Sequence, residues 1–418
     1  MVGIRGLVKK GLGDMGFNAG GGAINWFPGH MAAATRAIRD RLKLADLVIE
    51  VRDARIPLSS ANQDLQSHLS SKRRLIALNK KDLANPNIMH KWIRYFDSCK
   101  QDCIPINAHS KSSVNKNRLR QCGAGANFMF IMSFSWFYAQ KLLELVEVKL
   151  KEVISREPTL LVMVVGVPNV GKSALINSIH QIASSRFPGK MWLVQKMKRA
   201  TVGPLPGVTQ DIAGYKVGFY FLDFAFVPLF DHIAHQPSIY VLDTPGVLVP
   251  SIADIEIGLK LALSGSVKDS VVGEERIAQY LLAVLNTRGT PLHWKSSNSR
   301  RMEGIQNEFA EKVEYSLKNL RTRRKPANNS GVLYIEDLAA EVQNALYSTL
   351  AEFNGDVGDE NDLERLIEQQ FESLQKALNI PHKASEGRLM VSKKFLTLFR
   401  AGKLGPFILD DVPDTNTS

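Results

Sequence analysis

Cysteine and acidic side chains are scarce in this chain of 418 residues. The three cysteines, Cys99, Cys103 and Cys122, form no CxxC pair and no zinc-ligand spacing, which excludes a disulfide framework and fits a reducing compartment. Asp and Glu number 41 against 53 Lys and Arg, and the formal net charge is +12. This excess of positive charge favours a polyanionic partner such as nucleic acid.

Apolar runs long enough to cross a membrane are also missing. The apolar stretch 127–139 is too short for a transmembrane helix, and Asp223 and Pro228 interrupt the stretch 217–233. Neither end of the sequence carries a lipidation signal, which argues against a membrane-trafficking role. We therefore expect no integral membrane segment, while peripheral association with a membrane remains open.

The first 24 residues are basic and rich in glycine. Arg5, Lys9 and Lys10 against the single acid Asp14 give the charge bias of a mitochondrial transit peptide. The glycines weaken the helix that such a peptide needs. Residues 1–24 are therefore interpreted either as a transit peptide or as a disordered tail.

A glycine-rich loop predicts a phosphate site. The apolar run 160–165 indicates a buried strand, and residues 174–179 have one apolar face, as a helix would. Between them lies the pattern GxxxxGKS at 166–173, whose glycines let backbone N–H groups close on phosphate oxygens at a helix N-terminus. Lys172 would reach the β- and γ-phosphates, and Ser173 would bind Mg²⁺. The nucleotide contacts expected from this loop are Gly166, Pro168, Asn169, Val170, Gly171, Lys172 and Ser173.

A second motif predicts guanine recognition. The sequence Asn-Lys-Lys-Asp at 79–82 directly follows the apolar run 75–78. The Asp82 carboxylate can accept two hydrogen bonds from guanine, one from the ring N–H and one from the exocyclic amine. Adenine offers neither arrangement, and a buried carboxylate left unpaired costs roughly 1–3 kcal/mol. The base is therefore predicted to be guanine.

Neighbouring residues complete this predicted base site. We expect Asn79 to tie its loop to the phosphate loop and the stem of Lys80 to cover the base. The run 104–106 leads into Asn107 and Ala108, and the Ala108 N–H would meet the guanine oxygen. The predicted guanine site is Asn79, Lys80, Asp82, Asn107 and Ala108.

Two further motifs are typical of nucleotide switches. The sequence Pro-Gly-Val-Thr at 206–209 supplies Thr209, which would close on Mg²⁺ when a γ-phosphate is present. The sequence Asp-Thr-Pro-Gly at 243–246 follows another apolar run. Asp243 would hold a water molecule of the Mg²⁺ ion, and the Gly246 N–H would meet the γ-phosphate.

The order of the motifs is unusual. In ordinary GTPases the phosphate loop comes first and the guanine motifs come last, whereas here the guanine motifs precede the phosphate loop. The same sheet can form from a circularly permuted chain, because the ends of a compact domain lie at its surface. We expect residues 25–249 to form a circularly permuted P-loop GTPase domain of class α/β, with a mostly parallel sheet and helices on both faces.

Helical spacing of apolar residues continues after this domain. It predicts an all-helical C-terminal domain over residues 250–418. That domain ends in a basic amphipathic helix near 393–405, for which we favour contact with RNA over a merely solvated face. Three segments fit the expected elements badly, and we interpret them as insertions for which retained intron sequence is one source: 115–140, 189–193 and 217–232.

The motifs together resemble the circularly permuted GTPases that assemble the large ribosomal subunit, in the mitochondrial ribosome-associated branch that includes plant DAR GTPases. The resemblance covers residues 25–410 apart from the three insertions. The runs that carry it, in chain order, are WFPGHM (26–31), DARIP (53–57), NKKD (79–82), INAHS (106–110), GVPNVGKS (166–173), PGVT (206–209), DTPG (243–246), GLKLA (258–262) and GKLG (402–405).

The resemblance implies GTP hydrolysis coupled to maturation of the mitochondrial large ribosomal subunit, with binding to its rRNA. It implies GTP and Mg²⁺ as cofactors, a monomer, and a location in the mitochondrial matrix, with inner-membrane association open. The chloroplast and the cytoplasm are less favoured locations. A non-catalytic, GTP-gated RNA-binding scaffold is the alternative function.

The catalytic residues expected here differ from those of Ras-like GTPases. Val247 follows the DTPG motif, at the position where a glutamine orients the attacking water. Valine cannot do so, and the resemblance implies His30 for this role and Asn169 as a K⁺ ligand. The protein is then expected to be slow alone and stimulated by the ribosomal particle. The expected catalytic residues are His30, Lys172 and Thr209, and the expected metal ligands are Ser173, Thr209 and Asp243 for Mg²⁺ and Asn169 for K⁺.

Overall fold

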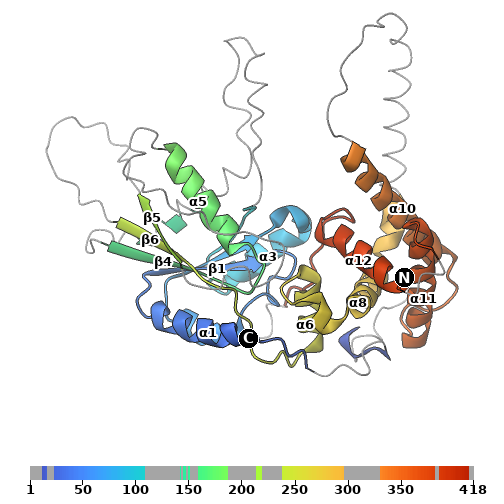
Figure 1. Ribbon diagram of the computed structural model, residues 1–418, viewed down its shortest axis with the longest axis horizontal. Helices are drawn as coiled ribbons and strands as arrows, with labels where there is room; N and C mark the ends of the chain where they lie inside the picture. The colour runs from blue at the N-terminus through green and yellow to red at the C-terminus, as the bar shows by residue number, and fades with distance from the viewer. Residues whose placement is uncertain are drawn as a thin grey trace, which may run out of the picture. The chain divides into compact units, whose positions relative to one another are not determined.

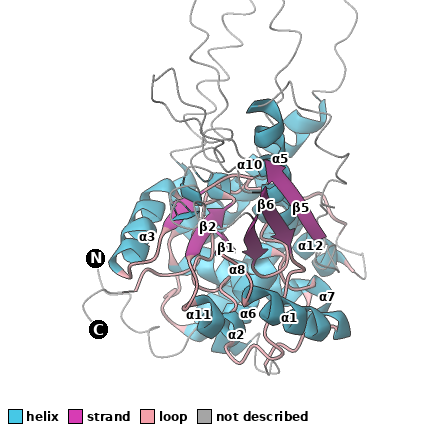
Figure 2. Ribbon diagram, turned by 90° about the vertical axis from the view of Figure 1, so that its left-hand side faces the viewer, coloured by secondary structure: helices cyan, strands magenta, loops and turns pink. Residues whose placement is uncertain are grey.

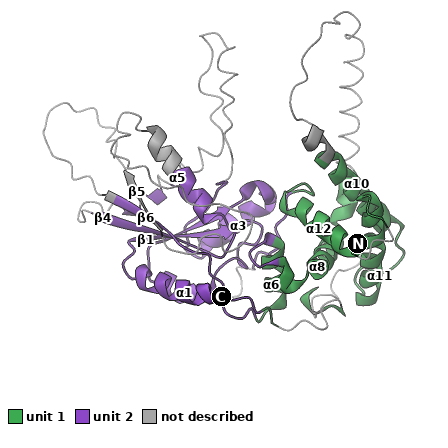
Figure 3. Cartoon of the chain, in the orientation of Figure 1, with its two compact units in different colours: residues 1–24, 253–263, 269–405 green, residues 25–252, 264–268, 406–418 purple. Residues whose placement is uncertain are grey.

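The computed structural model describes the greater part of the chain as two compact units (Figure 3). Unit 1 comprises Met1–Ile24, Ala253–Leu263 and Asp269–Gly405, and unit 2 comprises Asn25–Ile252, Ser264–Lys268 and Pro406–Ser418. The residues described are 12–16, 23–108, 142, 145–146, 149–150, 159–186, 213–218, 238–295, 330–381 and 386–413. The predicted insertions 115–140 and 189–193 lie outside them.

A six-stranded sheet forms the centre of unit 2, in the order β3-β2-β1-β4-β6-β5. Every neighbouring pair is parallel except β5 with β6, and Figure 2 shows β5 beside β6 at the edge. The strands are β1 (Leu47–Asp53), β2 (Arg74–Asn79), β3 (Cys103–Pro105), β4 (Thr159–Val165), β5 (Ala213–Gly218) and β6 (Ser238–Asp243). This arrangement confirms the predicted α/β class with a mostly parallel sheet.

The permuted order follows from which strands lie together. The strands that lead to the guanine motifs, β2 and β3, precede the phosphate-loop strand β4 in the chain. They lie on one side of β1 in the sheet. The phosphate-loop strand β4 pairs with the other side of β1 through Leu47–Val162 and Glu50–Val165. Because these strands are parallel, their carboxyl ends reach the same edge of the sheet.

Helices cover both faces of this sheet. They are α1 (Gly29–Leu42), α2 (Gln63–Leu69), α3 (Pro86–Ser98) and α5 (Lys172–Arg186), and Figure 1 shows α1 and α5 on opposite sides. The residues Ala34, Ile38 and Leu42 repeat at helical spacing and bury one side of α1 against Val48 and Met163 of the sheet. Trp92 and Phe96 of α3 fill a second core.

The first two residues of the predicted insertion 217–232 belong to the sheet, which contradicts its predicted start. Val217 and Gly218 continue β5, where they pair with Ile239 and Ser238 of β6. Residues 219–232 lie outside the described part of the chain. The boundaries predicted for the domains and insertions otherwise stay predictions.

Unit 1 is helical, as predicted for the C-terminal region. Its elements are α6 (Ile255–Ser264), α7 (Asp269–Val272), α8 (Glu274–Thr287), α10 (Ser330–Glu352), α11 (Glu360–Ala377) and α12 (Gly387–Arg400). Inside the bundle the side-chain amides of Asn286 and Gln370 exchange two hydrogen bonds of 2.8 Å, which joins α8 to α11. Among the described helices, none is long and apolar enough to cross a membrane.

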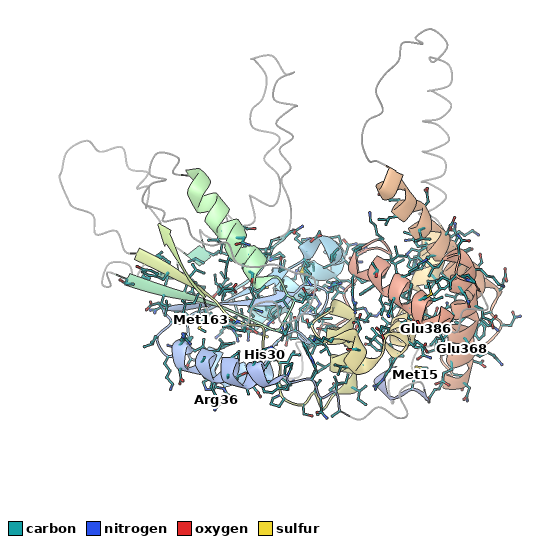
Figure 4. The ribbon with its side chains drawn as sticks, in the orientation of Figure 1. Met15, His30, Arg36, Met163, Glu368 and Glu386 are labelled. Carbon is teal, nitrogen blue, oxygen red and sulfur yellow. The ribbon has the colours of Figure 1, made fainter. Side chains whose placement is uncertain are left out.

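Part of the predicted N-terminal tail also belongs to unit 1. Leu12–Asp14 forms a short 3₁₀ turn that contacts α8, and Met15, labelled in Figure 4, is buried. Ile24 is buried as well, and a Cβ on Gly258 would collide with its side chain. These residues are packed, which differs from the disordered tail that was one of the two interpretations of residues 1–24.

Three basic side chains of α12 lie beside carboxylates of unit 1, and the fourth, Lys394, donates to the Leu378 carbonyl. Arg388 forms a two-pronged ion pair with Glu368, and Arg400 forms another with Asp269. Lys393 lies 3.8 Å from Glu274, and Lys403 lies 3.7 Å from Glu336. Cations held by carboxylates are less available to phosphates, which weakens the prediction that this helix contacts RNA.

The segment after α12 belongs to unit 2, although the sequence placed it in the helical domain. Ile408 is buried in the core that holds Trp92 and Phe96. The backbone N–H of Phe407 donates to the Leu83 carbonyl at 3.0 Å, and that of Leu409 donates to the Arg55 carbonyl at 2.7 Å. Residues 264–268 likewise belong to unit 2.

Asp410 fastens this segment to the loop after β1. Its carboxylate accepts hydrogen bonds from the N–H groups of Leu58 and Ser59, both at 2.9 Å, and from the Ser59 hydroxyl at 2.6 Å. We expect Asp410→Ala to lower the free energy of unfolding of unit 2 by roughly 2 kcal/mol, because the buried N–H of Ser59 and the partly buried N–H of Leu58 lose a charged acceptor. Denaturant titration followed by tryptophan emission measures the change. Asp411→Ala, at an exposed neighbour, is the control, and equal losses in both variants would contradict this role of Asp410.

Candidate functional site

The phosphate loop lies where the sequence predicted it, between β4 and α5. Its first glycine, Gly166, has φ of 152°, and a Cβ there would collide with the Val51 carbonyl oxygen of the neighbouring strand. Gly171 has φ of 93°, and a Cβ there would meet the Asn79 amide. Both positions therefore require glycine, one for close strand contact and the other for close contact with the guanine loop.

Lys172 begins α5 and is buried against this loop. Its ammonium group donates to the carbonyls of Gly166 at 3.1 Å and of Val167 at 2.9 Å. Burial lowers the pKa of Lys172 to about 8, although the nearby Asp243 carboxylate opposes the shift. The side chain thus carries a charge that burial disfavours and that an added anion would stabilise.

Ser173 and Asp243 bring two oxygen ligands together. The Ser173 hydroxyl donates to Asp243 Oδ2 at 2.8 Å. Burial raises the pKa of Asp243, and its Oδ1 atom is buried with no hydrogen-bond partner among the described residues. A hydroxyl beside a carboxylate with an unsatisfied oxygen fits the ligands that Mg²⁺ prefers. The third predicted ligand, Thr209, lies outside the described residues.

Asn79 joins the guanine motifs to the phosphate loop. Its side chain is fully buried, and its Nδ2 donates to the Val170 carbonyl at 2.7 Å. Its Oδ1 accepts the backbone N–H of Ala108 at 2.9 Å. One amide therefore connects the ends of β2 and β4 with the loop after β3. The Ala108 N–H, predicted to meet guanine, is engaged within the protein here.

The remaining residues of the predicted guanine site lie around this amide. Lys80 has a left-handed backbone with φ of 62°, and its ammonium lies 2.9 Å from Asp53 Oδ2. Asp82 is exposed in the short 3₁₀ turn Lys81–Leu83, and Asn107 is half-buried. The Lys81 N–H donates to the Ile106 carbonyl, which holds the two guanine loops together.

The DTPG segment packs directly on the phosphate loop. The Thr244 hydroxyl donates to the Val164 carbonyl at 2.7 Å. A Cβ on Gly246 would collide with the backbone of Pro168, so only glycine fits at this approach. Strand β6 thus delivers Asp243 and Gly246 to the loop that contains Lys172.

Val247 does not face this site, contrary to the expectation that it lies beside the γ-phosphate. Its side chain is fully buried in the core formed by α1, α2, β1 and β4. Its carbonyl accepts a hydrogen bond from Asn62 at 2.8 Å. A residue at this position is part of the core, which explains why a glutamine is absent.

His30 and Asn169 are placed by different elements. His30 is exposed in the first turn of α1, whose apolar side packs on the same core as Val247 (Figure 4). Asn169 has a left-handed backbone with φ of 59°, and its Nδ2 donates to the Gly265 carbonyl at 3.2 Å. Their roles in catalysis and in K⁺ binding stay predictions.

Asp53 and Arg55 of the DARIP run have no assigned role in the sequence analysis. Both side chains are buried and form an ion pair with each other, and Asp53 also pairs with Lys80. The signal that could have found them is charge inside a strand: all seven residues of β1 are buried, and three of them are charged. Buried charges are rare unless they are paired.

Comparisons with known proteins point to one family. A family model described as "50S ribosome-binding GTPase" matches residues 161–319, which include the phosphate loop but not the NKKD motif. The Arabidopsis thaliana protein "Short integuments 2, mitochondrial" is 67% identical over 412 residues, 98% of this chain and 95% of that protein. "DAR GTPase 2, mitochondrial", also from Arabidopsis thaliana, is 35% identical over 393 residues, 93% of this chain and 90% of that protein.

A mouse relative and a solved structure extend the comparison. "Mitochondrial ribosome-associated GTPase 1" of Mus musculus is 35% identical over 264 residues, 63% of this chain and 67% of that protein. The crystal structure of GNP-bound YlqF from T. maritima is 20% identical and covers 91% of this chain and 99% of its own, with a TM-score of 0.39.

The lowered pKa of Lys172 predicts proton uptake on nucleotide binding. At pH 8.5 the free side chain is mostly neutral, and a bound diphosphate would raise its pKa, so binding takes up a proton that it does not take up at pH 7. Titration calorimetry with GDP in buffers of different ionisation enthalpy measures this uptake. Lys172→Arg keeps its charge at both pH values and should show none. Equal buffer dependence for parent and variant would contradict the assignment.

Proposed function

This chain belongs to the circularly permuted GTPases of the mitochondrial ribosome-associated and DAR GTPase branch, and we propose that it hydrolyses GTP to GDP and phosphate during assembly of the mitochondrial large ribosomal subunit. Binding to the rRNA of that subunit couples the nucleotide state to maturation of the particle. The names of the relatives and the net charge of +12 support the ribosomal partner.

The observation that carries the proposal is the position of Asn79. A permuted chain binds GTP only if its guanine and phosphate motifs meet, and the Asn79 amide links Val170 to Ala108. The exposed Asp82 carboxylate then lies on the loop that this amide holds. Guanine is selected by Asp82, while the ribose and phosphates extend toward Lys172.

The phosphates are bound by the loop and the start of α5. Lys172 exchanges its two loop carbonyls for oxygens of the β- and γ-phosphates, and the Gly246 N–H donates to the γ-phosphate. Ser173, Asp243 and Thr209 would hold Mg²⁺, directly or through water, and the ion would supply positive charge against the phosphate oxygens.

A residue outside the DTPG segment must orient the attacking water, because Val247 is buried. We assign this role to His30, since α1 packs on the core around Val247 and begins with an exposed imidazole. Asn169 would provide an amide oxygen for K⁺, and the ion would supply positive charge near the phosphate loop. His30 reaches its working position on the ribosomal particle, so the free protein is slow.

The proposed location is the mitochondrial matrix, with peripheral association at the inner membrane. The Arabidopsis thaliana and Mus musculus relatives are named mitochondrial, which supports this location. The protein acts as a monomer on the particle.

A GTP-gated scaffold without turnover is a second candidate function, favoured only by the buried Val247. A measurement of GTP turnover on the particle distinguishes the GTPase from the scaffold.

The base choice is tested by Asp82→Asn. The amide places a donor against guanine's own donors, so GTP affinity should fall roughly tenfold or more, and xanthosine triphosphate should bind better because its base presents an oxygen there. Fluorescence titration with both nucleotides measures the change. Asp97→Asn, on the exposed side of α3, is the matched control. Unchanged GTP affinity in Asp82→Asn would remove NKKD from the base site.

The function itself is tested by GTP turnover with and without large-subunit precursors, in KCl and in NaCl. We expect strong stimulation by the particle in KCl and weaker stimulation in NaCl. His30→Ala should bind GTP normally but lose roughly 10²–10⁴-fold of the stimulated rate, the usual cost of removing a positioned proton-transfer or water-orienting group. Equal stimulation of His30→Ala and the parent would remove His30 from catalysis. No stimulation of the parent would remove the ribosomal particle from the proposal.

A further inference from the structure

Two buried pairs of arginine and carboxylate begin on strand β1, and the second extends into the loop after it, where Arg55 lies. In the first, Arg52 Nε and Nη2 donate to the two oxygens of Glu50 at 2.9 and 3.1 Å. In the second, Arg55 Nε and Nη2 donate to the two oxygens of Asp53 at 3.0 and 2.8 Å. Each pair spans two positions in the sequence, and all four residues are almost fully buried.

Only the second pair reaches the guanine loop. Asp53 Oδ2 lies 2.9 Å from the Lys80 ammonium. Burial alone would raise the pKa of Asp53, but Arg55 and Lys80 hold it well below its usual range. Burial lowers the pKa of Lys80, and Asp53 opposes that shift. The Asp53 carboxylate is therefore a permanent anion that fixes the Lys80 side chain.

The contact between Asp53 and Lys80 is important because of the backbone conformation of Lys80. Its left-handed backbone conformation is uncommon for a residue other than glycine and persists only where its surroundings hold it. The ion pair with Asp53 holds the side chain, while Asn79 and Lys81 hold the backbone on either side. Loss of the ion pair would free Lys80 without moving the phosphate loop.

The other pair serves as an internal comparison. Glu50 accepts further contacts from Arg74 and Gln66, and Arg52 donates to the Pro57 carbonyl. None of these partners belongs to the guanine or phosphate loops. The two pairs are thus alike in burial and in hydrogen-bond geometry, but they differ in their neighbours.

We propose that Asp53 and Arg55 are positioning residues for guanine binding, which act by fixing Lys80 over the base. The inference rests on the proposed guanine site. Arg55 also contacts both segments that return to unit 2: its Nη2 donates to the Ser264 carbonyl at 3.4 Å, and its own carbonyl accepts the Leu409 N–H. The pair therefore links the base loop to both segments that flank the larger part of the helical unit.

The test compares Arg55→Lys with Arg52→Lys. Lysine keeps the charge but cannot donate from a planar fork to both carboxylate oxygens. We expect Arg55→Lys to weaken GDP and GTP binding by the same factor, about tenfold, because both nucleotides share the base. KM for GTP should rise while kcat stays constant, since the contact is made equally in the ground and transition states. Arg52→Lys should bind both nucleotides like the parent.

A second pair of variants tests the same proposal if Arg55→Lys does not fold. Asp53→Asn and Glu50→Gln each replace a buried carboxylate by an amide of nearly the same shape. Asp53→Asn should reproduce the loss of affinity, and Glu50→Gln should not. Equal losses in the two variants would mean that the pairs are only structural, and a larger loss of GTP than GDP affinity would place the effect at the phosphates.

A double-mutant cycle identifies the route of the effect. If Asp53 acts through Lys80, then Lys80→Met and Asp53→Asn should each weaken GDP binding, and the double variant should lose no more than the larger single loss. Additive losses would overturn the inference. Failure of the parent to bind GDP would instead overturn the proposed function, and a parent that binds GDP beside an unaffected Asp53→Asn would overturn the inference alone.

Discussion

The side-chain amide of Asn79 is the contact on which the proposed nucleotide site depends. Permutation separates the guanine motifs from the phosphate loop along the chain, and only contacts across the sheet can rejoin them. The amide meets this need with one donor and one acceptor, to Val170 and Ala108, in a fully buried position. A buried amide with both groups satisfied tolerates little displacement, because either broken hydrogen bond would leave an unpaired polar group.

The buried charges of unit 2 fall into two kinds. Asp53 is satisfied by Arg55 and Lys80 and stays ionised, so it acts as part of the scaffold. At the phosphate site, by contrast, Lys172 has a lowered pKa and Asp243 a raised one, and Asp243 keeps an oxygen without a hydrogen-bond partner among the described residues. Groups whose charged forms are under-stabilised in this way are typical of a site built for a charged ligand.

Local motifs predicted the strands, the phosphate loop and the sheet class, because glycine spacing and apolar runs act over a few residues. The sequence could not give features that depend on distant contacts. The sequence predicts Val247 beside the phosphates because it directly follows DTPG. In the structure its side chain instead packs into the core that includes α1 and β4. The sequence of α12 predicts an RNA-binding surface, because the carboxylates that pair with its arginines lie on other helices and are not apparent from the helix itself. The proposed roles of Asp53 and Arg55 could not be predicted for the same reason, because they depend on a contact with Lys80, in the loop after β2.

The return of the segment after α12 has a consequence for synthesis of the chain. Leu58 and Asp410 are 352 positions apart, and Ile408 completes a core that begins with Ala54. During translation the loop after β1 therefore leaves the ribosome long before the residues that cover it. Until Ile408 is made, the apolar core around Trp92 stays exposed to water and to other chains. Such exposure is usual where native contacts join residues far apart in the sequence. The GTP-binding unit is among the first parts of the chain to be made and among the last to be complete.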